Sequence, residues 1–158
     1  MEKSKDVLNK LFVEVFNDIL LIEQQSFKNG ILSDLSVTEI HTIEAIGYKE
    51  SKTMSEIANS LNITVGTLTT AINKLIKKDY VERKRIETDR RVVLVQLTRK
   101  GKLAYRIHER FHREMINNAL SSLNSEEERV LVDALEKMTI FFKEKYIEDE
   151  NLKENNYE

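Results

Sequence analysis

The sequence predicts a mainly α-helical chain consisting of one domain extended by long helices. The 158 residues include no proline and only four glycines, so there is little material for the many turns of an all-β fold. Hydrophobic residues make up 41% and charged residues 33%, which suffices for a folded core. Over most of the chain the apolar residues recur every three or four positions, as on an amphipathic helix.

The composition also excludes several classes of protein. Because there is no cysteine, disulfides, thiol catalysis and cysteine-ligated metal sites are excluded. No apolar run reaches the roughly 18 residues needed to span a bilayer, and residues 1–10 are too charged for a signal peptide. We therefore expect a cytoplasmic protein with no membrane contact.

The first helix is expected from Ser4, its N-cap, to about Phe27, before Gly30. Its apolar positions, from Val7 to Ile22, cover more of the helix surface than one buried stripe requires. We therefore expect one face to pack in the core and another to contact a second copy of the chain.

Three shorter helices are expected next. Capping boxes at Ser36–Glu39 and Thr53–Glu56 begin the first two, and Gly47 ends the first. A tight turn at residues 62–63 precedes the third, which Thr64 caps. The apolar residues expected to face inward are Ile40, Ile43, Ile46, Ile57, Ala58, Leu61, Leu68, Ala71, Ile72, Leu75 and Ile76.

After these helices the apolar period changes to alternation. Residues 80–83 and 92–97 are typical of two strands, joined by a polar segment. Two long helices follow, the second beginning at a capping box, Ser125–Glu128.

The order helix, helix, tight turn, helix, hairpin is that of a winged helix-turn-helix, which we assign to residues 36–98. Residues 1–30 and 102–147 form the helical dimerisation region, and residues 148–158 form an acidic tail.

Charge is distributed unevenly along the chain. Residues 74–106 contain twelve lysines and arginines against four acids, a net charge of +8, while the remainder carries −10. A solvated surface would intersperse the two signs, so a basic block in an acidic chain indicates a polyanionic partner.

The third short helix has the side chains of a DNA-reading helix. Threonine hydroxyls suit phosphates or base edges, threonine methyls suit thymine, and asparagine can pair bidentately with adenine. An ordinary surface helix is the alternative, but it would carry Glu–Lys pairs rather than four threonines. The residues assigned to DNA contact are Thr64, Val65, Gly66, Thr67, Thr69, Thr70, Asn73 and Lys77.

The hairpin supplies a second DNA contact. Arginine suits a narrow minor groove, and Asp89 can orient Arg91 by a charge-assisted hydrogen bond. A charged hairpin is common by itself and becomes informative only after a recognition-type helix. The residues assigned here are Arg83, Lys84, Arg85, Asp89, Arg90 and Arg91.

These motifs resemble the MarR family of bacterial transcription regulators. The matching runs are Ser55-x-Ile57-Ala58-x-x-Leu61-x-Ile63, Thr67-Leu68-Thr69-x-x-Ile72-x-x-Leu75, Tyr80-Val81-Glu82-Arg83, and Asp89-Arg90-Arg91-x-Val93-x-Val95-x-Leu97-Thr98-x-x-Gly101. The Asp-x-Arg wing followed by Leu-Thr-x-x-Gly is the most specific of them. The resemblance implies a homodimer, interlocked through its first and last two helices, that binds an inverted-repeat operator in double-stranded DNA.

Within the family the chain is similar to FabT-type repressors of fatty-acid synthesis genes. The matching stretches are residues 39–43, 65–70 and 106–112. This similarity implies modulation by long-chain acyl-ACP and an acyl pocket between the first, second and fifth helices. The pocket residues are Ile19, Glu23, Ile40, His41, His108 and His112. Acyl carrier protein, an acidic protein, would find cationic partners in Arg99, Lys100, Lys102, Arg106 and Arg110.

The three histidines allow a second interpretation. His108 and His112, four residues apart, lie on one helical face and can chelate a metal. With His41 and Glu23 they resemble the ligand set of the family's zinc sensors. We expect a pocket or packing role instead, with no resident metal or cofactor, because FabT-type proteins carry the same histidines.

Other classes of function fit less well. The sequence has no Ser-His-Asp constellation, Gly-rich phosphate loop or paired-carboxylate motif, so we do not expect an enzyme. A structural interaction module would explain the helices but not the basic hairpin.

Overall fold

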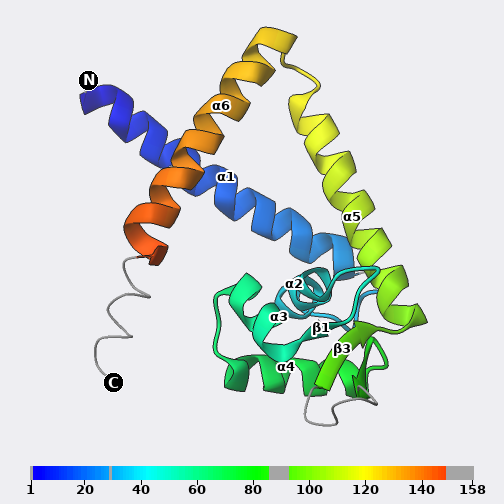
Figure 1. Ribbon diagram of the computed structural model, residues 1–158. Coiled ribbons are helices and arrows are strands. Elements are labelled where there is room, and N and C mark those ends of the chain that lie inside the picture. Colours follow the sequence, from blue (N-terminus) through cyan, green and yellow to red (C-terminus); the bar gives the residue numbers. More distant parts are fainter. Residues whose placement is uncertain (1, 29, 86–92, 149–158) are drawn as a thin grey trace. The chain divides into compact units, whose positions relative to one another are not determined.

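The computed structural model describes residues 2–28, 30–85 and 93–148. The chain divides into two compact units, and the boundary falls after His112, within helix α5. The elements of the chain, coloured along the sequence in Figure 1, are α1 (Glu2–Lys28), α2 (Val37–Ile46), β1 (Lys52–Thr53), α3 (Met54–Leu61), α4 (Val65–Lys77), β2 (Val81–Arg85), β3 (Val93–Leu97), α5 (Arg99–Leu120), α6 (Ser125–Phe142) and a π-helical turn (Lys143–Glu148).

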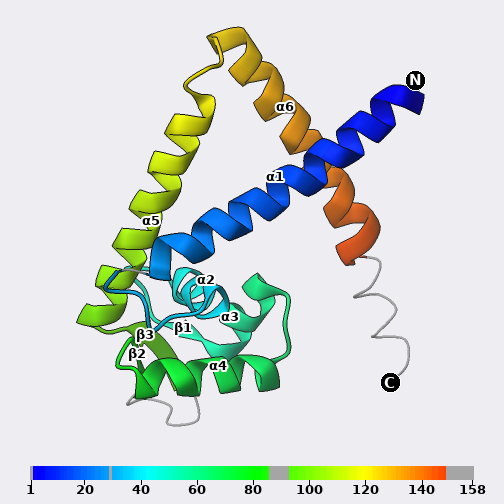
Figure 2. The same cartoon turned by 180° about the vertical axis from the view of Figure 1, so that it is seen from behind.

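The first unit is a winged helix-turn-helix, as the sequence predicts. Helices α2, α3 and α4 pack together beside a small antiparallel sheet of order β1-β3-β2 (Figure 2). In the hairpin, Val81 pairs with Leu97 and Arg85 with Val93. Strand β1 was not predicted, because two residues are too few to show an alternating pattern.

Local capping explains most of the helix boundaries. Both capping boxes, at Ser36–Glu39 and Thr53–Glu56, are present, and Thr64 caps α4. Gly47 ends α2 with a φ of 86°, a conformation that glycine adopts without a Cβ clash. Asn62 makes the predicted turn in the left-handed region, with a φ of 53°.

Two predicted caps were wrong. Ser4 lies inside α1, which begins at Glu2. Helix α6 is capped by Asn124, whose side chain accepts hydrogen bonds from the backbone of Glu126 and Glu127, rather than by Ser125. Asparagine and serine are both good N-caps, so adjacent candidates are hard to rank by residue type.

Most of the predicted inward residues form the core of the first unit, whereas Leu61, Ala71 and Ile76 are only partly buried. Ile40, Ile43, Ile46, Leu68, Ile72 and Leu75 are fully buried. The core extends beyond residues 36–98, because Phe27 at the end of α1 and Ala104 on α5 are also buried. Gly101 lets the start of α5 pack closely against Tyr80, since a Cβ at this position would lie 2.0 Å from the Tyr80 carbonyl oxygen.

In the second unit, α6 packs little of its surface within the chain. It has no buried residue, and its apolar side chains Val130, Val132, Leu135 and Ile140 are about half exposed. The predicted acidic tail, apart from Glu148, lies outside the described residues. Among the helices that the structure describes, none has the length and apolarity to cross a membrane.

Candidate DNA interface and histidine cluster

Helix α4 presents a continuous polar face to solvent. Val65, Gly66, Thr67, Thr70 and Asn73 are exposed, as predicted, and Lys77 extends the face to the last turn of the helix. The face lies opposite Leu68, Ile72 and Leu75, which hold α4 in the core. This arrangement leaves the outer face available for a partner.

Two of the predicted contact residues have structural roles in the helix. The Thr64 side chain is the N-cap and accepts from the backbone N–H of Thr67 at 3.2 Å. Thr69 is partly buried, and its hydroxyl donates to the Val65 carbonyl at 2.7 Å. Thr70, in contrast, has no hydrogen-bond partner among the described residues.

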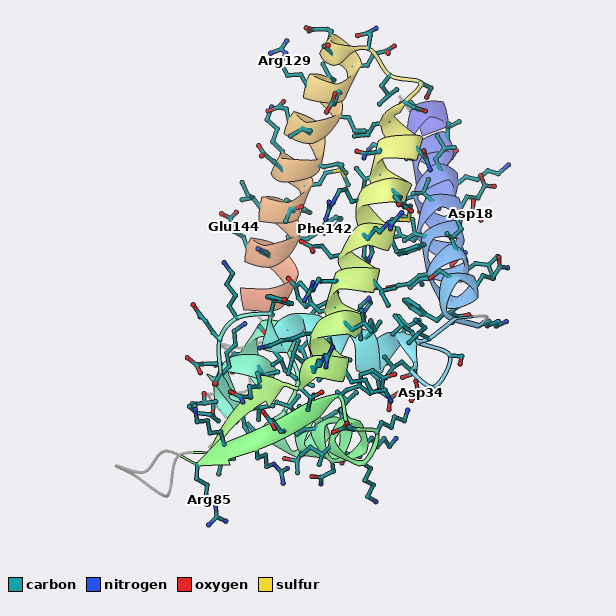
Figure 3. The ribbon with its side chains drawn as sticks, turned by 90° about the vertical axis from the view of Figure 1, so that its right-hand side faces the viewer. Asp18, Asp34, Arg85, Arg129, Phe142 and Glu144 are labelled. Atoms are coloured by element: carbon teal, nitrogen blue, oxygen red, sulfur yellow. The ribbon has the colours of Figure 1, made fainter. Side chains whose placement is uncertain are left out.

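The hairpin places arginines next to this face. Arg83 is exposed on β2 and donates through Nη2 to the Asn73 Oδ1 at 2.8 Å. Arg85 lies at the far end of β2, and its side chain points away from the helices (Figure 3). Lys84 is also exposed. The predicted wing residues Asp89, Arg90 and Arg91 lie outside the described residues.

The C-terminal end of α4 is fixed to the rest of the first unit by ion pairs. Lys78, which follows α4, donates to both carboxylate oxygens of Glu39 on α2, at 2.7 and 2.8 Å. Tyr80 is buried, and its hydroxyl donates to Asp34 at 2.6 Å. Lys100 at the start of α5 lies 4.0 Å from the centre of the Tyr80 ring. The orientation of α4 is therefore tied to α2 and α5.

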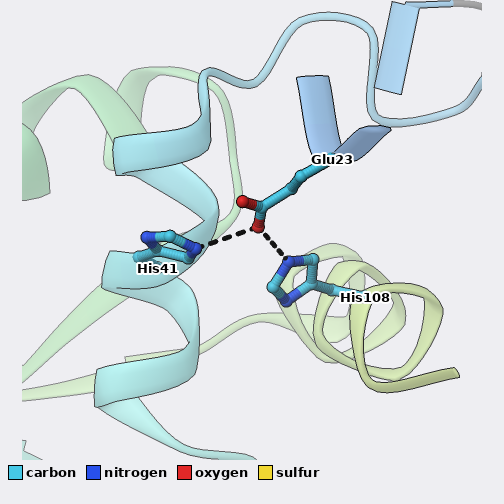
Figure 4. A group of neighbouring side chains, drawn as sticks. All are labelled: Glu23, His41 and His108. Carbon is cyan, nitrogen blue, oxygen red and sulfur yellow. Dashed lines mark hydrogen bonds and ion pairs between the residues drawn. The ribbon is translucent and has the colours of Figure 1, made fainter. Parts of the chain in front are cut away.

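A second polar site lies where α1, α2 and α5 meet. The Glu23 carboxylate, almost fully buried, accepts from the Nε2 atoms of His41 at 2.9 Å and of His108 at 2.8 Å (Figure 4). His108 is fully buried, and its Nδ1 donates to Glu44 at 2.7 Å. The Nε2 of His112 lies 3.1 Å from that of His108. We call these five residues the histidine cluster.

The charges within the histidine cluster stabilise one another. Burial alone would lower the pKa of His108, but the hydrogen bonds and negative charges of Glu44 and Glu23 raise it. Burial would raise the pKa of Glu44, but the hydrogen bond from His108 and the neighbouring imidazoles lower it. The cluster therefore favours a protonated His108 between carboxylates.

The predicted acyl-pocket residues lie beside an open cavity but do not line it. Four of its six residues, Glu23, His41, His108 and His112, contact one another and fill the volume between them, and Ile40 is buried in the core. Ile19 is half-buried, one turn earlier on α1. An open cavity of about 380 Å³ lies beside the cluster, lined by Gln24, Phe27, Lys28, Ser33, Leu35, Ser36, Val37 and Thr38. The Phe27 ring packs 5.5 Å from that of His108.

The histidine cluster also has the donor atoms of a zinc site. Within the described residues, two sets of three ligand-type side chains converge, namely Glu23 with His41 and His108, and Glu44 with His108 and His112. The ligand-type atoms of each set lie within 4.8 Å of one another. Imidazole nitrogens and carboxylate oxygens are ligands that zinc accepts, so the residues present fit this metal in chemical type.

Comparison with known proteins identifies the family of the chain. Residues 35–93 match the family model described as MarR family. A solved structure of Streptococcus pneumoniae FabT in complex with DNA is 36% identical, with a TM-score of 0.85, over 89% of this chain and 98% of that chain. The transcriptional regulator BilQ of Clostridium symbiosum is 30% identical over 87% of this chain and 92% of its own length. The chain belongs to the MarR family.

Membership of the MarR family settles the class of activity. The chain is a DNA-binding transcriptional regulator and not an enzyme. The Staphylococcus aureus MepR–DNA complex shares the MarR fold, with a TM-score of 0.69 at 21% identity over 84% of this chain and 94% of that chain.

Sequence reasoning missed two features of the MarR chain. Glu44 was not assigned, although it lies three residues after His41 and hence on the same face of α2. The contact between Asn73 and Arg83 was also missed, because it joins residues on different elements.

Proposed function

We propose that this MarR-family regulator represses bacterial fatty-acid synthesis genes and responds to long-chain acyl-ACP. The observation that carries the proposal is the likeness to FabT, which at 36% identity and a TM-score of 0.85 extends over both units of the chain. The MepR, Bordetella bronchiseptica BpsR and Escherichia coli MarR structures reach 21–23% identity, with TM-scores of 0.64–0.69.

DNA would bind through the outer face of α4 and through the hairpin. The exposed side chains of the α4 face are neutral or cationic, and the helix N-terminus adds a partial positive charge. The hairpin adds Arg83, Lys84 and Arg85 beside one exposed acid, Glu82. This surface carries part of the basic block in the sequence, including Lys77, Arg83, Lys84 and Arg85. We propose that the chain acts as a homodimer on an inverted repeat.

Acyl carrier protein would dock at the start of α5. An open groove of about 580 Å³ is lined there by Arg99, Lys100, Lys102 and Arg106, with Asp79 and Glu82 at one side. Lys100 is already paired with Asp34, and Arg106 donates to the Tyr48 hydroxyl. The exposed Arg99 and the half-exposed Lys102 therefore offer the charges most accessible to an acidic partner.

The acyl chain would enter between α1 and α2, beside the histidine cluster. Phe27, Leu35 and Val37 give the cavity there an apolar wall. Each buried methylene contributes about 0.8 kcal/mol, so the affinity should rise about fourfold per methylene until the cavity is filled.

A zinc-responsive regulator is a second candidate function. The observation that favours it is the convergence of Nε2 atoms from His41 and His108 on one Glu23 oxygen. Zinc would take the place of the protons in the hydrogen bonds from His41 and His108 to Glu23. It would hold α1, α2 and α5 together through these ligands.

One titration separates the two functions. Binding to a labelled duplex from the promoters of the organism's own fatty-acid synthesis genes is measured against long-chain acyl-ACP, unacylated carrier protein, and zinc. We expect only acyl-ACP to change the affinity. Lys102→Glu should weaken that response, whereas Lys49→Glu, at an exposed position between α2 and β1, should not. A response to zinc alone, lost in His108→Ala, would overturn the acyl proposal.

A further inference from the structure

We propose that Asn73 and Arg83 read DNA as one unit, in which Asn73 positions Arg83 and Arg83 makes the DNA contact. The inference rests on the hydrogen bond of 2.8 Å from Arg83 Nη2 to Asn73 Oδ1. It goes beyond the assignment of these residues as separate contacts.

The strand geometry explains why the two side chains meet. Side chains alternate along a strand, so Arg83 shares the face of Val81, which is buried in the core beneath α4. Arg83 lies two residues after Val81 on the same face of β2, but it is outside the core and beside the exposed side of α4. Arg83 therefore extends over the last turns of the helix.

The hydrogen bond changes what Asn73 can offer to a base. Bidentate recognition of adenine uses the amide oxygen as an acceptor and the amide nitrogen as a donor. Arg83 already occupies one of the two lone pairs of the Asn73 amide oxygen, and this bond fixes the amide with its nitrogen facing away from the arginine. An asparagine held in this way is a positioning residue for Arg83.

Arg83 retains most of its hydrogen-bonding capacity. A guanidinium group has five N–H donors, and only one is used by Asn73. Within the described part of the chain, Arg83 has no carboxylate partner to neutralise its charge. The free donors suit acceptor-rich DNA edges, either the O6 and N7 atoms of guanine or phosphate oxygens.

The proposal is tested by a double-mutant cycle on the full-length protein. The probe is a labelled duplex selected by the parent protein from a randomised pool, and a scrambled duplex gives the non-specific affinity. Asn73→Ala, Arg83→Ala and the double variant are compared. Lys49→Ala is the control, because this exposed cation lies between α2 and β1, outside the residues assigned to DNA contact and to the dimer.

We expect each single variant to weaken binding of the selected duplex about tenfold, the cost of one lost contact. The double variant should bind no more weakly than Arg83→Ala, because the two changes remove the same contact. Independent contacts would multiply to about a hundredfold loss, and this result would overturn the proposal. Unchanged binding by Arg83→Ala would overturn it as well.

Asn73→Asp separates positioning from direct base reading. Aspartate keeps the oxygen acceptor for Arg83 but loses the amide donor that adenine requires. The added negative charge weakens binding to both duplexes, so the ratio of selected to scrambled affinity should stay within about threefold of the parent. A ratio as low as that of Asn73→Ala would show that Asn73 reads the base itself.

The Arg83→Ala data also show whether Arg83 donates to a guanine base or to a phosphate group. A guanine contact predicts loss of preference at one base position in a repeated selection. A phosphate contact predicts uniform weakening and a salt slope reduced by about one. Either pattern, combined with the expected coupling to Asn73, supports the proposal.

Discussion

The pair formed by Glu39 and Lys78 illustrates how single residues control stability in this protein. Glu39 is buried, and burial alone would raise its pKa, but hydrogen bonds from Lys78 and from the backbone N–H of Ser36 lower it below 4.5. A carboxyl group with a lowered pKa in the folded state contributes stability above its unfolded pKa. That contribution disappears as the pH falls through the lowered pKa.

Lys78→Met should therefore destabilise the protein by about 1–3 kcal/mol at pH 7, because it leaves a buried carboxylate without its cation. The difference from the parent should shrink as the pH falls below 4.5 and disappear once the pH passes the lowered pKa of Glu39, where the parent's carboxylate is protonated too. Urea unfolding at pH 7 and pH 4 measures both quantities. Lys77→Met, at the exposed neighbouring position, is the control; equal stability of the two variants at pH 7 would contradict the prediction.

At the scale of the elements, alanine substitutions of two glycines should have opposite effects on stability, although both glycines lie in the first turn of a helix. At Gly101 a Cβ would meet the Tyr80 carbonyl oxygen at 2.0 Å, so Gly101→Ala forces α5 away from the β2 side of the core. Overpacking of this kind costs about 1–3 kcal/mol or more. At Gly66 a Cβ would meet only the Thr64 side chain, at 3.8 Å.

Gly66→Ala should therefore raise the stability of α4, by up to about 1 kcal/mol, because alanine favours the helix more than glycine does. If α4 approaches DNA closely, the same change should weaken operator binding, since the new methyl group faces the partner. Thermal unfolding and DNA binding are measured on both variants. A more stable Gly66→Ala protein with unaltered operator affinity would show that this part of α4 does not approach the duplex.

The limits of sequence-based prediction also follow from the elements. The capping boxes of α2 and α3 were predictable because their partners are three residues apart. The core positions of α4 were predictable because burial follows the helical period. Contacts between elements, such as Arg83 with Asn73 and His108 with Glu44, depend on packing angles that no local pattern contains. For the same reason, the sequence does not show that four residues of the predicted acyl pocket, Glu23, His41, His108 and His112, contact one another.

At the scale of the whole molecule, the unpaired apolar surface indicates self-association. In the single chain Phe16 is 64% exposed, and the apolar side chains around it on α1 are about half exposed, namely Val7, Leu8, Leu11 and Leu20. A monomer that left so many large side chains in water would be prone to aggregate. Two-fold pairing would cover them and place two α4 helices about 34–36 Å apart, one turn of DNA.

Phe16→Glu should therefore convert a dimer into a monomer, because it places a charge in an apolar interface. Glu14→Gln is the matched control, since Glu14 lies about 200° away around the helix from Phe16. Sedimentation equilibrium at micromolar concentration gives the mass, and operator binding should fall more than tenfold in the monomer because one half-site is then read alone. Moving the two half-sites apart by five base pairs should have a similar effect on the parent, since it turns one site to the opposite side of the duplex. A parent protein that sediments as a stable monomer would contradict the dimer, and with it the reading of an inverted repeat.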